Sequence, residues 1–415
     1  MSDPTIVETE HLRALRARRQ EEGPIFRVGE KFCAVLDADA VQRIEAANYA
    51  DLTMHDGFVD TVRGRTSEDF SWARLRSAWS KQMRHLTATA SLRDLARRMA
   101  DLLDAEVGRP QDLVWLAERA VVDPLIPMIV GGLAPRAQRR VVREVHSKVS
   151  WVLSDVDTHR APRGHRVRMM LHQLVAGLEV RRELSGRARG TRERRQDLAD
   201  PVVDMLGTLG IGRAVDAVTA LLTAITGSPG AAGACLLLEL SRRPEWQARL
   251  DAELGAIPLD ALCEAPTRLA PSATAFVKEI LRIWSSPPFV TRTVRTDIRD
   301  ERVSLEQGEV YLLSSYLIHH DADTWTDADV FRPERWMGSE NGARCPHGPY
   351  VPFGWAPKSC IGANLGMAQL VLFMHLFCTR YRLEVANPER AQIAVASVVR
   401  PKDFHGTLVR REGNA

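Results

Sequence analysis

The sequence predicts a mainly α-helical fold with a smaller β region, organised as a single domain over residues 1–415 with a short flexible N-terminus of about 1–20. Apolar residues recur at helical spacing through most of 72–284 and again over 363–378. Short strand-like runs bounded by Gly or Pro lie before and after the first of these stretches. No internal repeat or low-complexity linker divides the chain, and its length is compatible with one large domain.

The composition is that of a soluble globular protein, with 45% hydrophobic and 26% charged residues. The formal net charge of +3 is small and both signs are mixed, so no nucleic-acid partner is indicated. The first twenty residues are charged throughout and lack the apolar core of a signal peptide. The cysteines form no C-x-x-C pair and no regular framework, which disfavours a disulfide scaffold or zinc site and fits a reducing cytoplasm. They are Cys33, Cys235, Cys263, Cys345, Cys360 and Cys378.

One apolar segment, 217–238, has no formal charge and is long enough to span a bilayer. It contains Gly227, Pro229, Gly230 and Gly233, and ionic residues close both of its ends. A central helix buried on every side of a large domain has the same pattern. We therefore expect a core helix here and no membrane partner.

In the N-terminal part, two short strands are expected between Gly23 and Asp37, around a turn at Gly29-Glu30, and a helix follows at about 39–47. The segment 54–70 is polar, contains Gly and has no periodicity. We expect a long loop there, and loops of this length in compact domains are commonly functional.

A helix over 72–86 is predicted because Trp72, Leu75, Arg76 and Trp79 share one face at i, i+3, i+4 and i+7 spacing. An Arg one turn from a Trp is either a surface cation lying over an aromatic ring or part of a donor pair for a buried carboxylate. Further helices are expected at about 91–107, 113–129, 137–153 and 167–182.

The second half begins with a long central helix at about 212–242, and Pro244 starts the next helix, which runs to about Leu254. A helix over 271–284 is stopped by Pro287-Pro288. Strands are expected at 290–294 and within 303–313, and an apolar helix at 363–378.

The loop before the last helix indicates the chemistry. It reads Phe353-Gly354-Trp355-Ala356-Pro357-Lys358-Ser359-Cys360-Ile361-Gly362. A thiolate at the start of a helix is stabilised by the helix dipole and by free backbone N–H groups. An anionic sulfur held in this way suits an axial ligand of haem iron. Taken alone, Cys360 is more often a small buried hydrophobe, so its interpretation depends on the rest of the chain.

Four motifs occur together in the order and at the separations of the cytochrome P-450 superfamily, which the chain resembles over essentially its whole length. They are W-x-x-x-R at Trp72 and Arg76, E-x-x-R at Glu279 and Arg282, F-x-P-E-R-W over 331–336, and the cysteine loop. The last is similar to the pattern F-G-x-G-x-R-x-C-x-G. The resemblance implies the superfamily's fold, with haem b between the central helix and the helix after the cysteine loop.

The resemblance also implies roles for individual residues. Cys360 is the expected thiolate ligand of the haem iron, and therefore the metal ligand. Arginine is suited to the haem propionates because it makes charge-assisted contacts. The other implied cofactor-binding residues are Trp72, Arg76, Arg292, Lys358 and Phe353. The implied buried ion-paired triad, which fixes the loop before the cysteine, is Glu279, Arg282 and Arg335.

The cysteine loop departs from the superfamily pattern at two positions. Its second glycine is replaced by Ala356, which limits backbone freedom if that position needs a positive φ. Its arginine is replaced by Lys358, which pairs a propionate only as a point charge.

The central helix departs further. The superfamily's acid-alcohol pair falls on Gly227 and Ser228, so the acid is absent, and Ser228 with Thr226 are the candidate catalytic alcohols. Pro229 is expected to remove one helical hydrogen bond and kink the helix, or else, with the glycines, to let the helix pass close over a flat ligand. Without the acid, protons for bound dioxygen must come from ordered water or a substrate group, or peroxide must replace dioxygen.

The resemblance thus implies a soluble, bacterial-type haem-thiolate monooxygenase acting on a small organic substrate, in specialised metabolite biosynthesis. A separate ferredoxin and ferredoxin reductase, or equivalent donors, are implied because the chain has no flavin or iron–sulfur module. Expected substrate contacts are 54–70, 222–228, 288–291 and the region of Phe404-His405.

Two alternatives stay open. A peroxide-driven, coupling or rearranging haem enzyme is favoured by the missing acid and disfavoured by the retained Ser228. A non-catalytic helper protein that binds a partner enzyme is disfavoured by the presence of Cys360, because such relatives typically lose the thiolate.

Overall fold

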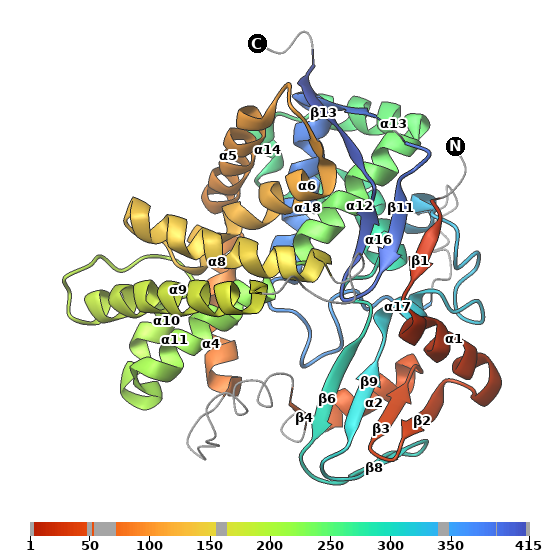
Figure 1. Cartoon of the computed structure of the whole chain (residues 1–415). Coiled ribbons are helices and arrows are strands. Elements are labelled where there is room, and N and C mark those ends of the chain that lie inside the picture. Colours follow the sequence, from red (N-terminus) through yellow and green to blue (C-terminus); the bar gives the residue numbers. More distant parts are fainter. Residues whose placement is uncertain are drawn as a thin grey trace.

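The computed structural model describes residues 4–47, 52–53, 72–154, 164–338, 348–386 and 388–411. The fold is mainly helical, and the strands form small sheets on one side of the helical part (Figure 1). The predicted fold class is therefore confirmed. The loop expected at 54–70 and Cys345 lie outside the described residues.

The first helices span α1 (Glu10–Glu22), α2 (Ala38–Ala47), α4 (Trp72–Leu86), α5 (Thr89–Glu106), α6 (Leu113–Val122), η1 (Asp123–Leu125), α7 (Ile126–Ile129), α8 (Pro135–Ser154) and α9 (His165–Ala188). They are followed by α10 (Asp200–Asp204), α11 (Leu206–Ala224), α12 (Ser228–Arg242), α13 (Pro244–Gly255), α14 (Leu259–Leu262), α15 (Pro266–Leu269), α16 (Pro271–Ile283), α17 (Ser315–His319), η2 (Pro333–Trp336) and α18 (Ala363–Thr379).

The strands form four small sheets. A five-stranded sheet has the order β2 (Ile25–Gly29), β3 (Phe32–Val35), β9 (Val310–Leu313), β6 (Val290–Val294) and β4 (Leu52–Thr53). One three-stranded sheet has the order β1 (Ile6–Glu8), β11 (Gln392–Val395) and β12 (Val399–Lys402). The other three-stranded sheet has the order β10 (Tyr381–Val385), β13 (His405–Arg410) and β5 (Pro110–Asp112). The fourth pairs β7 (Ile298–Arg299) with β8 (Ser304–Leu305).

The N-terminus of about 1–20 was expected to be flexible, but the chain from residue 6 to residue 22 is part of the fold. Strand β1 pairs in parallel with β11, so that Ile6 lies opposite Ile393. Helix α1 follows, and it buries Leu12 and Leu15 in the main core. The expectation of flexibility rested on the many charged residues of α1, but Leu12 and Leu15 are buried and Arg19 donates to the carbonyl oxygen of Leu317.

The predicted helix at 113–129 is divided. Helix α6 ends at Val122, and Pro124 and Pro127 occupy the first turns of η1 and α7. Proline lacks a backbone N–H and is tolerated only in the first turn of a helix. The chain therefore restarts a helical turn at each proline instead of continuing one helix.

The central helix is also divided, as the sequence anticipated for the region of Pro229. Helix α11 ends at Ala224 and α12 begins at Ser228, with Gly227 between them at φ +102°. Pro229 lies in the first turn of α12. By length and composition the stretch Leu206–Arg242 could cross a membrane, but 61% of its apolar window is buried inside the fold. It is the core helix that the sequence predicted.

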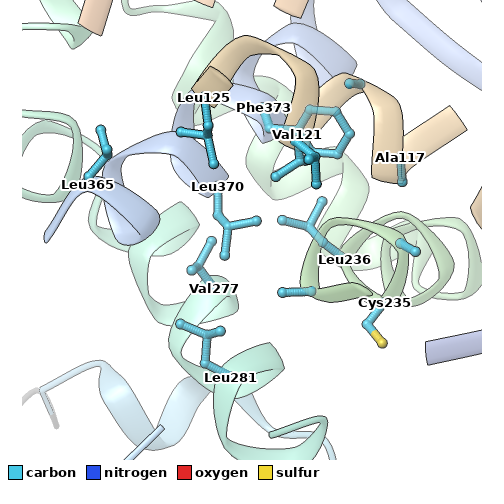
Figure 2. Packing of buried hydrophobic residues seen from close by; sticks show 14 of the residues in the cluster. Ala117, Val121, Leu125, Cys235, Leu236, Val277, Leu281, Leu365, Leu370 and Phe373 are labelled. Atoms are coloured by element: carbon cyan, nitrogen blue, oxygen red, sulfur yellow. The ribbon is translucent and has the colours of Figure 1, made fainter. Parts of the chain in front are cut away.

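The main core forms where α6, α12, α16 and α18 meet. Figure 2 shows apolar side chains from all four helices pointing toward one another, including Val121, Leu236, Val277 and Leu370. These four side chains are at most 4% exposed. Burial of this extent fixes α12 against α18, and the cysteine loop lies directly before α18 in the chain.

Candidate active site

The cysteine loop is held by backbone hydrogen bonds before α18 begins. The N–H of Cys360 donates to the carbonyl oxygen of Phe353 over 2.7 Å, and the N–H of Gly354 donates to Val351 over 3.1 Å. Gly354 has φ +76°, a left-handed conformation that L side chains rarely adopt. The loop therefore closes as a tight turn with Cys360 at its end.

The side chain of Cys360 is not part of the packed core. Its side chain keeps exposed surface, whereas the other cysteines of the described residues are buried. The interpretation of Cys360 as a small buried hydrophobe is therefore wrong. Burial by the surrounding protein raises the pKa of the Cys360 thiol, and the N–H of Gly362 and the charge of Arg76 lower it by less. Coordination to a metal ion deprotonates a thiol outright, so the anionic form requires the metal as well as the loop.

The replacement of the second loop glycine is compatible with the backbone. The described non-glycine residues with positive φ are Asp327 and Asp403, and Ala356 is not among them. The side chain of Ala356 is exposed, and its carbonyl oxygen accepts a hydrogen bond from Gln42 over 3.3 Å. Because this position needs no left-handed conformation, alanine is accommodated without strain.

The predicted triad is present and fully buried. Arg282 donates to both carboxylate oxygens of Glu279, over 3.0 and 2.8 Å, and Nε of Arg335 donates to Oε1 of Glu279 over 3.0 Å. The indole N–H of Trp336 also donates to Glu279, over 2.8 Å. The remaining guanidinium N–H groups of both arginines donate to backbone carbonyls between His319 and Val330. The triad thus fixes the segment that leads to the cysteine loop.

His319 connects the triad to the loop, a role that the sequence analysis missed. Its Nδ1 lies 3.1 Å from the carbonyl oxygen of Arg282, and its Nε2 accepts the backbone N–H of Val351 over 2.9 Å. Burial lowers the pKa of His319 well below its ordinary value, so the ring is neutral. No local pattern marks this residue, because its partners lie 37 and 32 residues away.

Two of the predicted propionate-binding cations lie beside a buried acid. Nε of Arg292 is 3.5 Å from Oε1 of Glu45, and the ammonium of Lys358 adds an attractive charge at the same carboxylate. Burial raises the pKa of Glu45, and these two cations oppose that rise. Among the described residues, the two carboxylate oxygens of Glu45 have no hydrogen-bond partner, and Nε of Arg292 has none either. Glu45 is therefore a buried acid whose charge is opposed by two basic side chains.

Arg76 also contacts the loop. It projects from α4, and its Nη2 donates to the carbonyl oxygen of Ser359, the residue before Cys360. Phe353 is half-buried and faces α18, because a Cβ placed on Gly366 would lie 3.8 Å from its ring. Trp72 is the first residue of α4, but its side chain lies outside the described residues.

These residues fit a haem group. The exposed thiol of Cys360 would supply the thiolate ligand, and the arginine and lysine charges near it would suit the propionates. The observation that supports the fit is that the buried carboxylate oxygens of Glu45 and Nε of Arg292 lack hydrogen-bond partners among the described residues, because buried polar groups are costly without partners. Cys360, Phe353 and Lys358 belong to the cysteine loop, and Arg76 contacts this loop from α4.

The central-helix alcohols lie at the break between α11 and α12. Ser228 is the first residue of α12 and is half-buried. Thr226 donates its hydroxyl to the carbonyl oxygen of Thr223 over 2.7 Å, so its hydroxyl caps α11. Of the two, Ser228 is the better candidate for a role in the site.

The structure also explains the missing acid. Gly227 has φ +102°, and a Cβ there would lie 3.0 Å from Cγ1 of Val398 and 3.3 Å from Cγ1 of Val152. Both the conformation and the space disfavour any side chain at this position. A carboxylate at 227 is therefore incompatible with this helix geometry.

One expected substrate contact is replaced by a packing role. Phe404 is 1% exposed and belongs to the main core, so it does not face a ligand. The segment 288–291 lies at the start of β6, where the carbonyl oxygen of Pro288 accepts a hydrogen bond from Ser314 over 2.6 Å.

Comparison with protein families identifies a family model that matches more than half of the chain. The family model described as Cytochrome P450 matches residues 150–405. Cytochrome P450 714C3 of Oryza sativa subsp. japonica is 31% identical over 176 residues, which cover 40% of this chain and 33% of that protein. The mitochondrial 1,25-dihydroxyvitamin D(3) 24-hydroxylase of Mus musculus is 30% identical over 168 residues, which cover 40% and 32%. The matches span about a third of the length of these curated relatives.

Solved structures share the fold across nearly the whole chain. The retinoic acid-bound cyanobacterial CYP120A1 superposes with a TM-score of 0.76 at 16% identity, covering 95% of this chain and 94% of that one. A zebra fish cytochrome P450 solved with abiraterone gives a TM-score of 0.75 at 18% identity, covering 96% and 98%. At these identities the likeness establishes the fold alone.

Proposed function

Because the chain belongs to the cytochrome P450 family, we propose that it is a haem-thiolate monooxygenase that oxidises a small organic substrate. The observation that carries the proposal is the exposed thiol of Cys360, on a backbone that is fixed by the hydrogen bond from the N–H of Cys360 to the carbonyl oxygen of Phe353. Haem is the cofactor of this family, and when bound to a thiolate it supplies the chemistry of O–O cleavage.

The chain's own residues perform four tasks in this proposal. Cys360 binds the iron of haem b. Arg292 and Lys358 would offer positive charge to one propionate, and Arg76 holds the loop through Ser359.

The remaining task falls to the central helix. Ser228 offers a hydroxyl at the helix break, where it can hold a water molecule or pass on a proton.

The proposal also covers the electron donors and the metabolic role of the protein. Electrons come from a separate ferredoxin and its reductase, because the described residues contain neither a flavin motif nor a cluster of cysteines. The unusual oxygen-handling residues favour a specialised role in secondary metabolism, in the cytoplasm of a bacterium, over broad detoxification.

The optical spectrum of the purified holoprotein, reduced and exposed to carbon monoxide, tests the proposal. A thiolate-type spectrum in the wild type and its loss in Cys360→Ser are expected. Cys378→Ala is the matched control, because Cys378 is a buried cysteine on α18 outside the loop. A wild-type spectrum of imidazole or thiol type, or a protein without haem, would contradict the proposal and favour the non-catalytic alternative.

A peroxide-driven oxygenase is the second candidate, and the geometry of Gly227 favours it. A helix that has no room for the acid lacks one usual route for protons to dioxygen. Turnover with peroxide alone is compared with turnover with a surrogate ferredoxin, its reductase and oxygen. Product with the reductase system alone excludes the second candidate, and product with peroxide alone excludes the first.

A further inference from the structure

Helix α9 carries an apolar stripe on a face that is exposed to solvent. Its members recur at i, i+3, i+4, i+7, i+8 and i+11, so they share one side of the helix. Each of these side chains is between 36% and 66% exposed, and together they run roughly 16 Å along the helix. The α9 stripe consists of Val167, Met170, Leu171, Leu174, Val175 and Leu178. Soluble monomers rarely expose a continuous apolar patch unless it binds something.

Another face of α9 already has its packing partners, so the stripe is a second apolar face. Ala176, Val180 and Leu184 are buried in the main core, and a Cβ built on Gly177 would lie 3.7 Å from Val215 of α11. Figure 1 shows α9 lying beside α8, with both helices at the edge of the helical part. One apolar face is enough to hold a helix on a core, and α9 has a further one that faces solvent.

The exposed charges of α8 and α9 are all positive. The acids of the two helices are Glu144, Glu179 and Glu183, and all three are buried and paired with lysine or arginine. The chain as a whole has a formal net charge of only +3, so positive charge is concentrated on this pair of helices. The exposed arginines of the two helices are Arg136, Arg139, Arg140, Arg143, Arg166, Arg168, Arg181 and Arg182.

The arginines border the α9 stripe. Arg168, Leu171 and Val175 follow one another at i, i+3 and i+7, so this arginine lies along the edge of the stripe. Burial lowers the pKa of His172, and the charges of Arg143 and Arg168 lower it further. Both arginines therefore lie near the same ring, where α8 and α9 meet. The positive charge of α8 is thus next to the stripe of α9.

The surface of α8 is hollowed around the same arginine. The residues that line this open hollow are Pro135, Gln138, Arg139, Val142, Arg143 and His146. Nε2 of His146 lies 2.6 Å from Oδ1 of Asp123, so the histidine already has an acid beside it. Arg139 and Arg143 are the two guanidinium groups of the hollow, and guanidinium groups suit the oxygens of a phosphate.

A second copy of the chain is a poor occupant for this surface. Two copies related by two-fold symmetry would bring the stripe against itself. Both ends of the stripe carry arginine, with Arg166 and Arg168 at one end and Arg181 and Arg182 at the other. Whether the two helices ran parallel or antiparallel, arginines would lie opposite arginines, and like charges across an interface are costly.

A lipid surface fits the composition better than a protein partner. A protein is recognised through a complementary pattern of charges that fixes its register, and its interfaces are enriched in aromatic residues. The α9 stripe contains only valine, leucine and methionine, and the exposed charges around it have one sign. An aliphatic stripe bordered by arginine is typical of a helix that lies in the plane of a membrane interface.

We propose that α8 and α9 form a docking surface for an anionic phospholipid membrane, with the α9 stripe at the boundary between headgroups and acyl chains and the arginines on lipid phosphates. This contact is peripheral and involves no membrane span, because the apolar central helix is buried in the fold. The expectation that the chain has no membrane partner is revised for this surface. The contact uses residues outside the haem site, so it goes beyond the proposed function.

Flotation of the purified holoprotein with lipid vesicles tests the proposal. Vesicles of phosphatidylcholine alone are compared with vesicles that also contain phosphatidylglycerol, at low and at high salt. The wild type is expected to float with the anionic vesicles at low salt, and to float much less at high salt or with the neutral vesicles. Absence of binding to the anionic vesicles, or equal binding to both kinds, would overturn the proposal.

The double variant Leu171→Gln with Leu174→Gln tests the apolar contribution. Losing two leucines from the α9 stripe should lower the affinity for anionic vesicles by roughly tenfold or more. Ile6→Gln is the matched control, because Ile6 is an exposed aliphatic residue on β1 and lies outside this surface. If the double variant binds as tightly as the control, the stripe does not enter the membrane and the proposal is wrong.

The double variant Arg139→Gln with Arg143→Gln tests the charges. An arginine near an anionic surface contributes about fivefold in affinity, so the loss of two should weaken binding by roughly tenfold or more and reduce its salt dependence. Arg382→Gln is the control, because Arg382 is an exposed arginine on β10. The substituted side chains are at the surface, so the thermal unfolding midpoints should match that of the wild type. Unchanged affinity in this folded double variant would contradict the proposal.

Sedimentation velocity and the optical spectrum separate the remaining outcomes. A wild-type dimer that the double leucine variant disperses, together with no vesicle binding, would overturn the proposal in favour of a second copy of the chain. Vesicle binding that depends on the stripe and on the arginines, by a protein without a thiolate-type spectrum, would support the docking surface and contradict only the haem function.

Discussion

Val351 donates its backbone N–H to Nε2 of His319 over 2.9 Å, and this bond joins the buried triad to the cysteine loop. The same ring places Nδ1 at 3.1 Å from the carbonyl oxygen of Arg282. An imidazole that donates from Nδ1 and accepts at Nε2 must be neutral. The loop of Cys360 is therefore held through a histidine that cannot become charged without losing one of these bonds.

Stability is expected to fall in acid because of His319 and its neighbour His320. Burial lowers the pKa of His319 well below its ordinary value and that of His320 to about 3. The unfolded chain takes up protons near pH 6.5, whereas the folded protein does not, so acid favours unfolding. Below pH 6.5 each histidine removes up to about 1.4 kcal/mol of stability per pH unit. Urea unfolding at several pH values measures this slope.

A variant of His319 measures how much of the loss of stability in acid is due to this residue. His319→Gln is expected to be less stable at pH 7 and to show a shallower loss of stability below pH 6.5. His405→Gln is the control, because His405 is exposed on β13. An unchanged slope in His319→Gln would show that His319 is not neutral in the folded protein.

Removing the acid of the triad is expected to be severely destabilising. Glu279→Gln leaves the guanidinium groups of Arg282 and Arg335 buried without their counter-charge. Breaking a buried ion pair from one side costs about 3–5 kcal/mol. Asp297→Asn is the control, because the Asp297–Arg299 pair is exposed and such pairs contribute about 0–1 kcal/mol. Equal unfolding midpoints for the two variants would contradict the structural role of the triad.

Cys360 is expected to matter for the cofactor and little for the fold of the apoprotein. Its side chain is exposed, so Cys360→Ala should change the free energy of unfolding of the apoprotein by at most about 0.5 kcal/mol. Cys378→Ala removes a buried sulfur from α18 and should cost more, about 1 kcal/mol. Unfolding of both apoproteins, together with haem titration, checks the contrast. A large loss of apoprotein stability in Cys360→Ala would mean that the thiol is a packing residue.

The glycines around the break in the central helix are expected to resist substitution. Gly227→Ala places a Cβ on a left-handed residue against Val398, and should cost about 1–2 kcal/mol or more. Gly230→Ala forces α6 and α12 apart at Glu118 and should cost about 1–3 kcal/mol. Gly207→Ala on α11 meets no atom within 4 Å and should leave stability unchanged or slightly raised. Thermal unfolding of the three variants ranks them, and a neutral Gly230→Ala would refute the close helix contact.

The sequence by itself determined the features whose cause is local. Helical periodicity predicted α4, α16 and α18 to within a residue or two, and the order of the motifs led to Cys360 and to the buried triad. Pro229 marked the interruption of the central helix, because proline cannot continue a helix from an interior position. These features depend on residues within a few positions of one another.

Only the tertiary structure decided the contacts between distant segments. The pairing of β1 with β11 converts an N-terminus expected to be flexible into an edge of a sheet. Whether Ala356 is strained depends on its φ angle, which cannot be read from the sequence. The approach of Glu118 to Gly230 joins two helices more than a hundred residues apart. Such contacts are set by how whole helices pack, and the pattern within one helix carries information only about which face is buried.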